Sequence, residues 1–158
     1  MQAGGACSLT FMKQHKFYFS LALLAVFFAK AITHADVVTD WNDAALNAVR
    51  AAKTPPPVAS RALAILHASI YDAVNGIIRT HEAYFVPSAV PASASTEAAA
   101  SAAAHQALTA LFPAAANFDE LHTTVLAAIP NGPQKNAGIA WGESVADRIL
   151  ALAFPGWL

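Results

Sequence analysis

The sequence predicts an all-α fold, an antiparallel bundle of four to five helices preceded by a signal peptide. Three observations support this prediction. Hydrophobic residues make up 56% of the 158 residues and charged residues only 12%, which is typical of a folded domain and not of a disordered chain. Alanine supplies much of the apolar fraction, which favours closely spaced helices. Apolar residues also recur at helical spacing in segments that prolines separate.

The first 35 residues have the pattern of a signal peptide. Lys13 and Lys16 form a basic region, residues 17–29 are apolar, and Thr33 and Ala35 are small residues at the expected positions before a cleavage site. The apolar run ends at Lys30 and falls short of the ~20 residues that a membrane span needs. A retained membrane anchor is therefore the weaker alternative, and we expect an exported protein, periplasmic or secreted, with no stable membrane span after cleavage.

Two details of this segment stay open. Cleavage after Ala35 competes with cleavage after Ala31, because Ala29 and Ala31 also provide small residues at the required spacing. Residues 1–11 have no leader character, which indicates that they are a spurious extension and that Met12 is the start.

Residues 36–158, the expected mature domain, are acidic and contain no cysteine. They hold six lysines and arginines against ten aspartates and glutamates, a balance of −4. No basic stripe for nucleic acid remains. The single cysteine of the chain is Cys7, so the sequence excludes disulfides and thiolate metal sites from this domain.

The first two expected helices meet at a proline-rich turn. The first spans about 40–52, with Thr39 or Asp40 as its cap, and ends at the sequence TPPP, residues 54–57. The second begins near Pro57 and keeps helical periodicity for more than five turns, which predicts the central helix of the bundle. Its apolar face consists of Val58, Ala62, Ile65, Leu66, Ile70, Ala73, Val74 and Ile77.

Three more helices follow a surface loop at 81–95, which is rich in proline, serine and alanine. The third helix starts near Ser95 and ends before Pro113. The fourth is expected at about 116–129 and the fifth at 134–154. Gly138 and Gly142 in the fifth helix lower its helix propensity, so we expect another helix to pass close to them.

No residue pattern in this chain predicts a complete active site. The histidines of the mature domain, at positions 67, 81, 105 and 122, are not three or four residues apart, the spacing of a metal-binding pair on one helix. No nucleophile elbow, Walker loop or dinucleotide fingerprint is present. The prediction is therefore that the chain has no catalytic, cofactor-binding or metal-binding residues of its own.

One short pattern resembles a known signature. In SRALAILH, residues 60–67, Arg61 precedes His67 by six residues, as in the third signature of the type-2 phosphatidic acid phosphatase and vanadium haloperoxidase superfamily. The resemblance implies an arginine that binds phosphate or vanadate and a histidine that attacks or coordinates it. The rest of the signature is missing, since Tyr71 stands where the family has an acid, Lys53 is one residue too far from Arg61, and no Ser-Gly-His occurs.

We therefore interpret Arg61 as a cap or an ion-pair partner on the helix exterior, and His67 as hydrogen-bonded in or beside the core. Structural roles are expected for other polar and aromatic residues as well. Tyr71 should reach a partner from the core edge, and Asp72 and Asn75 should bind neighbouring turns. We expect Trp41 and Trp141 to be packing anchors, and Glu143, Asp147 and Arg148 to form a solvated face.

A wider resemblance covers nearly all of residues 36–158. The segments DWNDAALNAVRAAKTPPPVASRALAILHASIYDAVNGI, EAYFVP, ALTALFP and AAIPNGPQKNAGIAWGESVADRILAL are similar to the N-terminal helical region of secreted bacterial vanadium-dependent haloperoxidase-like proteins. The resemblance implies a helical bundle outside the cytoplasm, with the vanadate or phosphate site in the later half of a longer protein.

Two functional expectations follow. The first is a truncated N-terminal scaffold domain, 36–158, inactive alone, whose parent acts on halide or on phosphate esters, a choice that this sequence does not decide. The ending LALAFPGWL motivates it. Its partner would be the missing C-terminal catalytic half or a second copy. The alternative is a stand-alone exported helical binding module with no catalytic role.

Overall fold

The computed structural model describes residues 36–115 and 117–153. The chain divides into two compact units, Met1–His34 and Ala35–Leu158, and every described residue belongs to the second. The signal-peptide prediction for residues 1–35 and the C-terminal residues 154–158 lie outside the described residues. The described part is all-α, as predicted, and consists of α2 (Val37–Ala51), α3 (Pro56–Ile78), α4 (Thr96–Leu111), α5 (Phe118–Ala127) and α6 (Pro133–Ala153).

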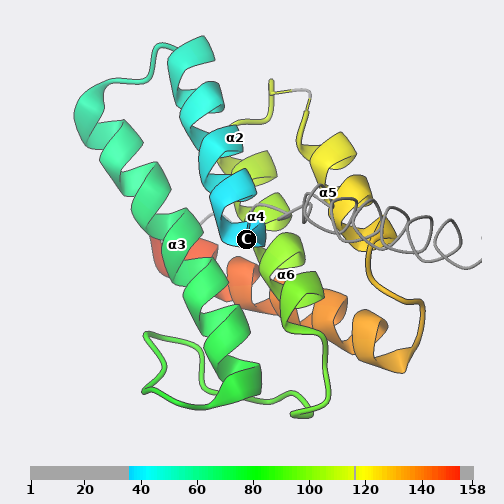
Figure 1. Ribbon diagram of the computed structural model, residues 1–158. Coiled ribbons are helices and arrows are strands. Elements are labelled where there is room, and N and C mark those ends of the chain that lie inside the picture. The colour runs from blue at the N-terminus through cyan, green and yellow to red at the C-terminus, as the bar shows by residue number, and fades with distance from the viewer. Residues whose placement is uncertain (1–35, 116, 154–158) are drawn as a thin grey trace, which may run out of the picture. The chain divides into compact units, whose positions relative to one another are not determined.

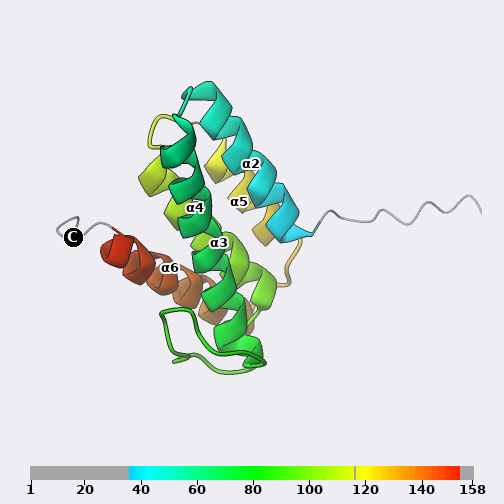
Figure 2. The same ribbon diagram turned by 90° about the vertical axis from the view of Figure 1, so that its left-hand side faces the viewer.

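Four of the helices alternate in direction and the fifth crosses them. α2 and α4 run upward in Figure 1, whereas α3 and α5 run downward. α6 crosses these helices at a steep angle in both views (Figures 1 and 2). The predicted helical bundle is therefore confirmed, with α2 to α5 alternating in direction and α6 crossing them.

Capping residues set the ends of the helices. The Asp36 side chain accepts a hydrogen bond from the Val38 amide at 3.4 Å, so α2 begins at Val37 and not at residue 40 as the sequence predicted. Ser95 caps α4 through the Ala98 amide at 3.1 Å. Arg79 ends α3 in the left-handed conformation, with φ of 59°, a common way to close a helix.

The centre of the fold is α4 and not α3, contrary to the prediction. α4 packs against α2, α3, α5 and α6, and its buried residues are almost all alanines, so four neighbours can approach its axis. α3 reaches the surface at both ends, where Val58 is 55% exposed and Ile78 is 53% exposed. The apolar residues that recur along α3 contact α2, α4 and α6, and some of them line a groove at the surface.

The crossing of α4 and α6 confirms the expectation drawn from the two glycines. A Cβ atom added to Gly138 would lie 2.5 Å from the Ser95 carbonyl oxygen, and one added to Gly142 would meet the Ala99 carbonyl oxygen. Both contacts are with backbone, which has little freedom to move aside. The glycines therefore let the two helix backbones touch, and this gain offsets their low helix propensity.

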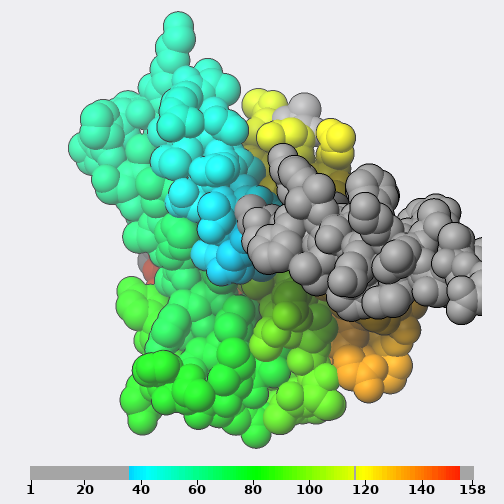
Figure 3. Space-filling view, in the orientation of Figure 1, coloured from blue at the N-terminus to red at the C-terminus, as the bar shows by residue number. Residues whose placement is uncertain are grey.

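Two apolar clusters fill the interior, each around one tryptophan. Trp41 is fully buried with Leu66, Leu108 and Phe118 in the first. Trp141 lies in the second and donates from its indole Nε1 to the Ala73 carbonyl at 3.0 Å. Both are packing anchors, as predicted. Figure 3 shows the side chains of α2 and α3 in contact at the surface of this face. None of the helices in the described ranges has the length and apolarity that crossing a membrane requires.

Candidate functional site

Arg61 and His67, the pair that resembles an anion-binding signature, contact two different helices. The Arg61 guanidinium donates to the Ala153 carbonyl at the end of α6. The His67 Nε2 forms a hydrogen bond of 3.2 Å with the Asn42 side-chain oxygen of α2. Six residues on a helix turn through about 600°, which separates the two side chains by about 120° around the axis of α3. Both side chains are hydrogen-bonded to another helix, as the structural interpretation predicted, but His67 is exposed and not in the core.

The polar residues at the C-terminal end of α3 hold the long loop that follows it. Asp72 is fully buried, and its two carboxylate oxygens accept hydrogen bonds from the backbone amides of Tyr84, Phe85 and Val86 at 2.7 to 2.8 Å. Three amide donors supply the solvation that a buried carboxylate loses.

Two neighbours of Asp72 bind the same loop. Asn75 exchanges hydrogen bonds with the backbone of His81, at 2.8 and 3.0 Å, and the Tyr71 hydroxyl donates to the Glu82 carbonyl at 2.9 Å. The predicted structural roles of Tyr71, Asp72 and Asn75 are therefore confirmed.

The predicted solvated face on α6 is right only in part. Glu143 and Arg148 are exposed. Asp147 is half-buried and accepts a hydrogen bond of 2.7 Å from the Gln106 side chain of α4, so it links the two helices. The pattern of three charged residues in the sequence did not reveal this partner on another helix.

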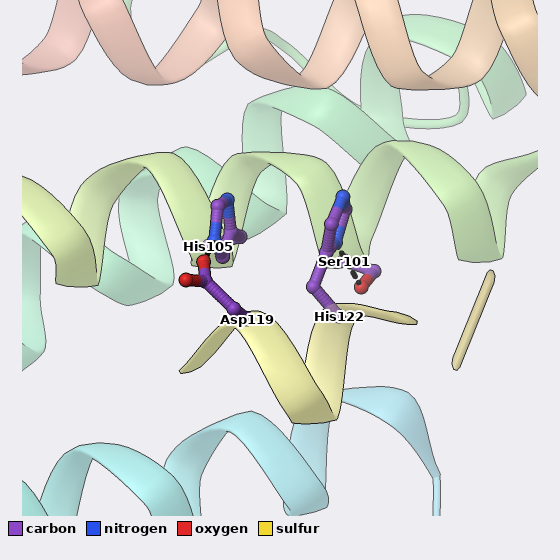
Figure 4. Close-up of polar contacts among 4 residues, drawn as sticks. All are labelled: Ser101, His105, Asp119 and His122. Carbon is purple, nitrogen blue, oxygen red and sulfur yellow. Dashed lines mark hydrogen bonds and ion pairs between the residues drawn. The ribbon is translucent and has the colours of Figure 1, made fainter. Parts of the chain in front are cut away.

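A polar cluster that the sequence reasoning missed lies between α4 and α5 (Figure 4). α4 contributes Ser101 and His105, one turn apart, and α5 contributes Asp119 and His122. His105 Nε2 lies 2.7 Å from the Asp119 carboxylate, and Ser101 Oγ lies 3.0 Å from His122 Nδ1. The two imidazole rings are stacked, with centroids 4.5 Å apart and planes 15° apart.

Trp41 of α2 connects the cluster to the core. Its indole Nε1 donates to Ser101 Oγ at 3.3 Å, and its ring lies against both histidine rings, with centroids 6.3 Å from His105 and 6.4 Å from His122. The cluster therefore joins three helices through side chains alone. We call these five residues, Trp41, Ser101, His105, Asp119 and His122, the imidazole cluster.

Burial and charge act against a proton on His122. Loss of hydration and then the neighbouring His105 lower the pKa of His122 below its ordinary value of 6.5, while Asp119 and a hydrogen bond with the Ser101 backbone oppose this shift. Two imidazolium rings at stacking distance would repel each other. The environment therefore favours neutral His122.

The geometry of the imidazole cluster fits helix linkage better than catalysis. Ser101 is fully buried, so a substrate could not reach its hydroxyl as a nucleophile. Within the described ranges, no three histidine, cysteine, aspartate or glutamate side chains are arranged to hold a metal ion. No buried side-chain nitrogen or oxygen there lacks a hydrogen-bond partner, which leaves no orphaned polar group for a ligand to satisfy.

One apolar groove marks the surface of the same unit. It has a volume of about 460 Å³ and lies along the C-terminal half of α3, where Val38 of α2 closes one side. Ile70, Val74 and Ile78 form its apolar lining, and Tyr71, His67 and His81 are among its polar residues.

Comparisons with known proteins gave no match. No family model, no curated protein and no solved structure matches this chain. The fold and the hydrogen bonds described above define this protein as an all-α unit whose buried polar side chains link one helix or loop to another.

Proposed function

We propose that residues 36–158 are the helical scaffold of an exported protein of the vanadium haloperoxidase and type-2 phosphatidic acid phosphatase type, inactive on its own. The vanadate or phosphate site of such a protein would be built by other polypeptide. The resemblance of segment order and spacing supports the family, and the helical fold is compatible with it.

One observation carries the scaffold role. Arg61 and His67, the residues with the greatest resemblance to an anion-binding signature, are directed to α6 and α2 and bind polar groups of those helices. An oxyanion site needs donors that converge on one point. These two side chains diverge and serve to position α3.

The test is turnover by the full chain with vanadate added. Halide oxidation with peroxide and hydrolysis of a phosphate ester are both expected to stay at the level of a blank. Turnover that disappears in Arg61→Ala and persists in Arg148→Ala, the control at an exposed arginine of α6, would overturn the scaffold role. The DNA that follows the reading frame is expected to encode Ser-Gly-His, and its absence would count against the family.

A second candidate function is a stand-alone binding module, favoured by apolar surface around α3. Tyr84 is 67% exposed and Phe85 is 41% exposed, and the groove of about 460 Å³ is largely apolar. Large exposed apolar areas mark interaction sites. The scaffold role predicts that the isolated chain associates or aggregates to cover this surface, whereas a soluble monomer in light scattering would favour the independent module.

A further inference from the structure

α5 is the helix with the weakest apolar attachment. It has ten residues, of which Phe118 alone is buried, and α4 is the helix against which it packs most closely. A helix of this length is unstable by itself in water, so its folded state depends on its contacts. The polar contacts of the imidazole cluster therefore carry an unusual share of the attachment of α5.

Two hydrogen bonds of the imidazole cluster meet at the Ser101 hydroxyl. Ser101 Oγ accepts a hydrogen from Trp41 Nε1 and forms a second hydrogen bond with His122 Nδ1, at 3.0 Å. A hydroxyl can donate to a bare Nδ1 or accept from an Nδ1–H, so this second bond can form in either protonation state of His122. The effect of acid on the cluster therefore lies in the contact between the two rings.

The charges around the stack make one added proton acceptable and a second one costly. His105 has the Asp119 carboxylate at 2.7 Å to balance a positive charge. His122 faces His105 and Ser101 from α4, Asp119 from its own helix, and the uncharged Trp41 from α2. Asp40 and Asp43 of α2 line a separate groove together with Glu120. A second proton would thus place two cations at ring-stacking distance.

We propose that the stacked pair His105–His122 is a proton-operated clasp that holds α5 on α4 at neutral pH and releases it in mild acid. Protonation of both rings places two imidazolium ions at the stacking distance of 4.5 Å, where they repel each other. Release of α5 removes Phe118 and Leu121 from the first apolar cluster and takes the Phe118 ring away from the Trp41 ring, whose centroid lies 6.4 Å from it. Acid would therefore expose part of this apolar cluster.

The test is amide hydrogen exchange of the full chain between pH 7.5 and 5.5, corrected for the intrinsic pH dependence of exchange. Protection of α5 is expected to fall several-fold in acid, while protection of α3 and α6 stays constant. His122→Gln, which cannot gain a proton, is expected to abolish this fall. His67→Gln, the matched control at an exposed histidine of α3, is expected to retain it.

Two results would overturn the clasp: protection of α5 that does not change with pH in the unmodified chain, or an equal fall in His122→Gln. If His122→Gln does not fold, His105→Gln provides the second test. Without the neighbouring ring, the His122 resonance in NMR should titrate at higher pH than in the unmodified chain. An unchanged titration of His122 would show that the two rings do not act on each other.

Discussion

α4 presents two different interfaces on one helix, one to α6 and one to α5. Towards α6, glycines and alanines bring the two backbones into contact, and the Trp141 ring packs on Gly76 of α3 beside this crossing. Towards α5, α4 carries Ser101 and His105, which meet polar side chains at 2.7 and 3.0 Å. The first interface depends mainly on the close approach of small residues, with one hydrogen bond between Gln106 and Asp147 across it, and the second depends on hydrogen bonds between side chains.

The difference predicts how each interface responds to change. The α4–α6 crossing depends mainly on contacts between small groups, so it should be sensitive to added volume. The α4–α5 interface contains the stacked imidazoles of His105 and His122, and the pKa of His122 lies below its ordinary value because of burial and the neighbouring His105. It should tolerate changes in volume better and respond to acid. α4 therefore takes part in one interface that is sensitive to added volume and in another that is expected to respond to pH.

The largest effect is expected from Gly142→Ala at the α4–α6 crossing. The new methyl group would meet the carbonyl oxygen of Ala99 and lie 2.9 Å from the Ala103 amide nitrogen. Alanine has the higher helix propensity, by about 1 kcal/mol, but a clash with backbone forces the two helices apart. We expect a net loss of about 3 kcal/mol in the free energy of unfolding, measured by urea denaturation.

Gly132→Ala is the matched control, because its added Cβ would approach only the end of the Gln134 side chain, at 3.3 Å. This variant should unfold within about 0.5 kcal/mol of the unmodified chain. A Gly142→Ala chain that is as stable as this control would show that the two helices do not cross in contact.

A smaller effect is expected from Ser101→Ala at the α4–α5 interface. The substitution removes the acceptor of the Trp41 indole and the hydrogen-bond partner of His122 Nδ1, and it leaves the buried indole N–H without a partner. Such a group costs about 2 kcal/mol. Urea denaturation at pH 7.5 should show this loss, and hydrogen exchange should locate it in α2 and α5.

Ser144→Ala, at an exposed serine of α6, is the control for Ser101→Ala and should be neutral or slightly stabilising through helix propensity. Equal stability of the two serine variants would mean that the α4–α5 interface depends on apolar contact alone, which would remove the contrast with the α4–α6 crossing.

The sequence was sufficient to predict the helices and the close approach of another helix at Gly138 and Gly142, because both predictions depend on the chemistry of nearby residues. Prolines and caps limit where a helix can run, and Gly138 and Gly142 signal a close neighbour without identifying it. The central position of α4 was not predictable in this way. Its alanines carry a weak periodic signal, whereas α3 has large apolar residues whose periodicity is easy to detect and which nevertheless reach the surface at Val58 and Ile78.

The imidazole cluster escaped prediction because its two histidines are on different helices. A search for histidines three or four residues apart finds only pairs on one helix. A usable signal was present in mixed pairs: Ser101 and His105 are four apart, and Asp119 and His122 are three apart. Each pair shares one helical face, and the two helices are joined by a short connection, which favours their contact.

The smallest effect at neutral pH is expected from Asp119→Asn, which changes the α4–α5 interface through charge with little change of shape. Asp119 is 90% exposed, and exposed ion pairs contribute at most about 1 kcal/mol, so stability at pH 7.5 should change little. In acid, the stabilities of the variant and of the unmodified chain are expected to differ. Asp119 raises the pKa of His122 against the lowering by burial and by His105, so its loss lowers that pKa further.

The sign of the pH effect follows from this shift. A histidine whose folded-state pKa lies below its ordinary value of 6.5 binds fewer protons than in the unfolded chain, so its stability contribution is complete above that value and is lost as the pH falls below it. Asp119→Asn should therefore lose more stability than the unmodified chain between pH 7.5 and 5.5 in urea denaturation. Asp43→Asn, at an exposed carboxylate of α2, should match the unmodified chain. A smaller loss in Asp119→Asn would show that this carboxylate does not favour the protonated stack, and the α4–α5 interface would then owe its response to acid to burial alone.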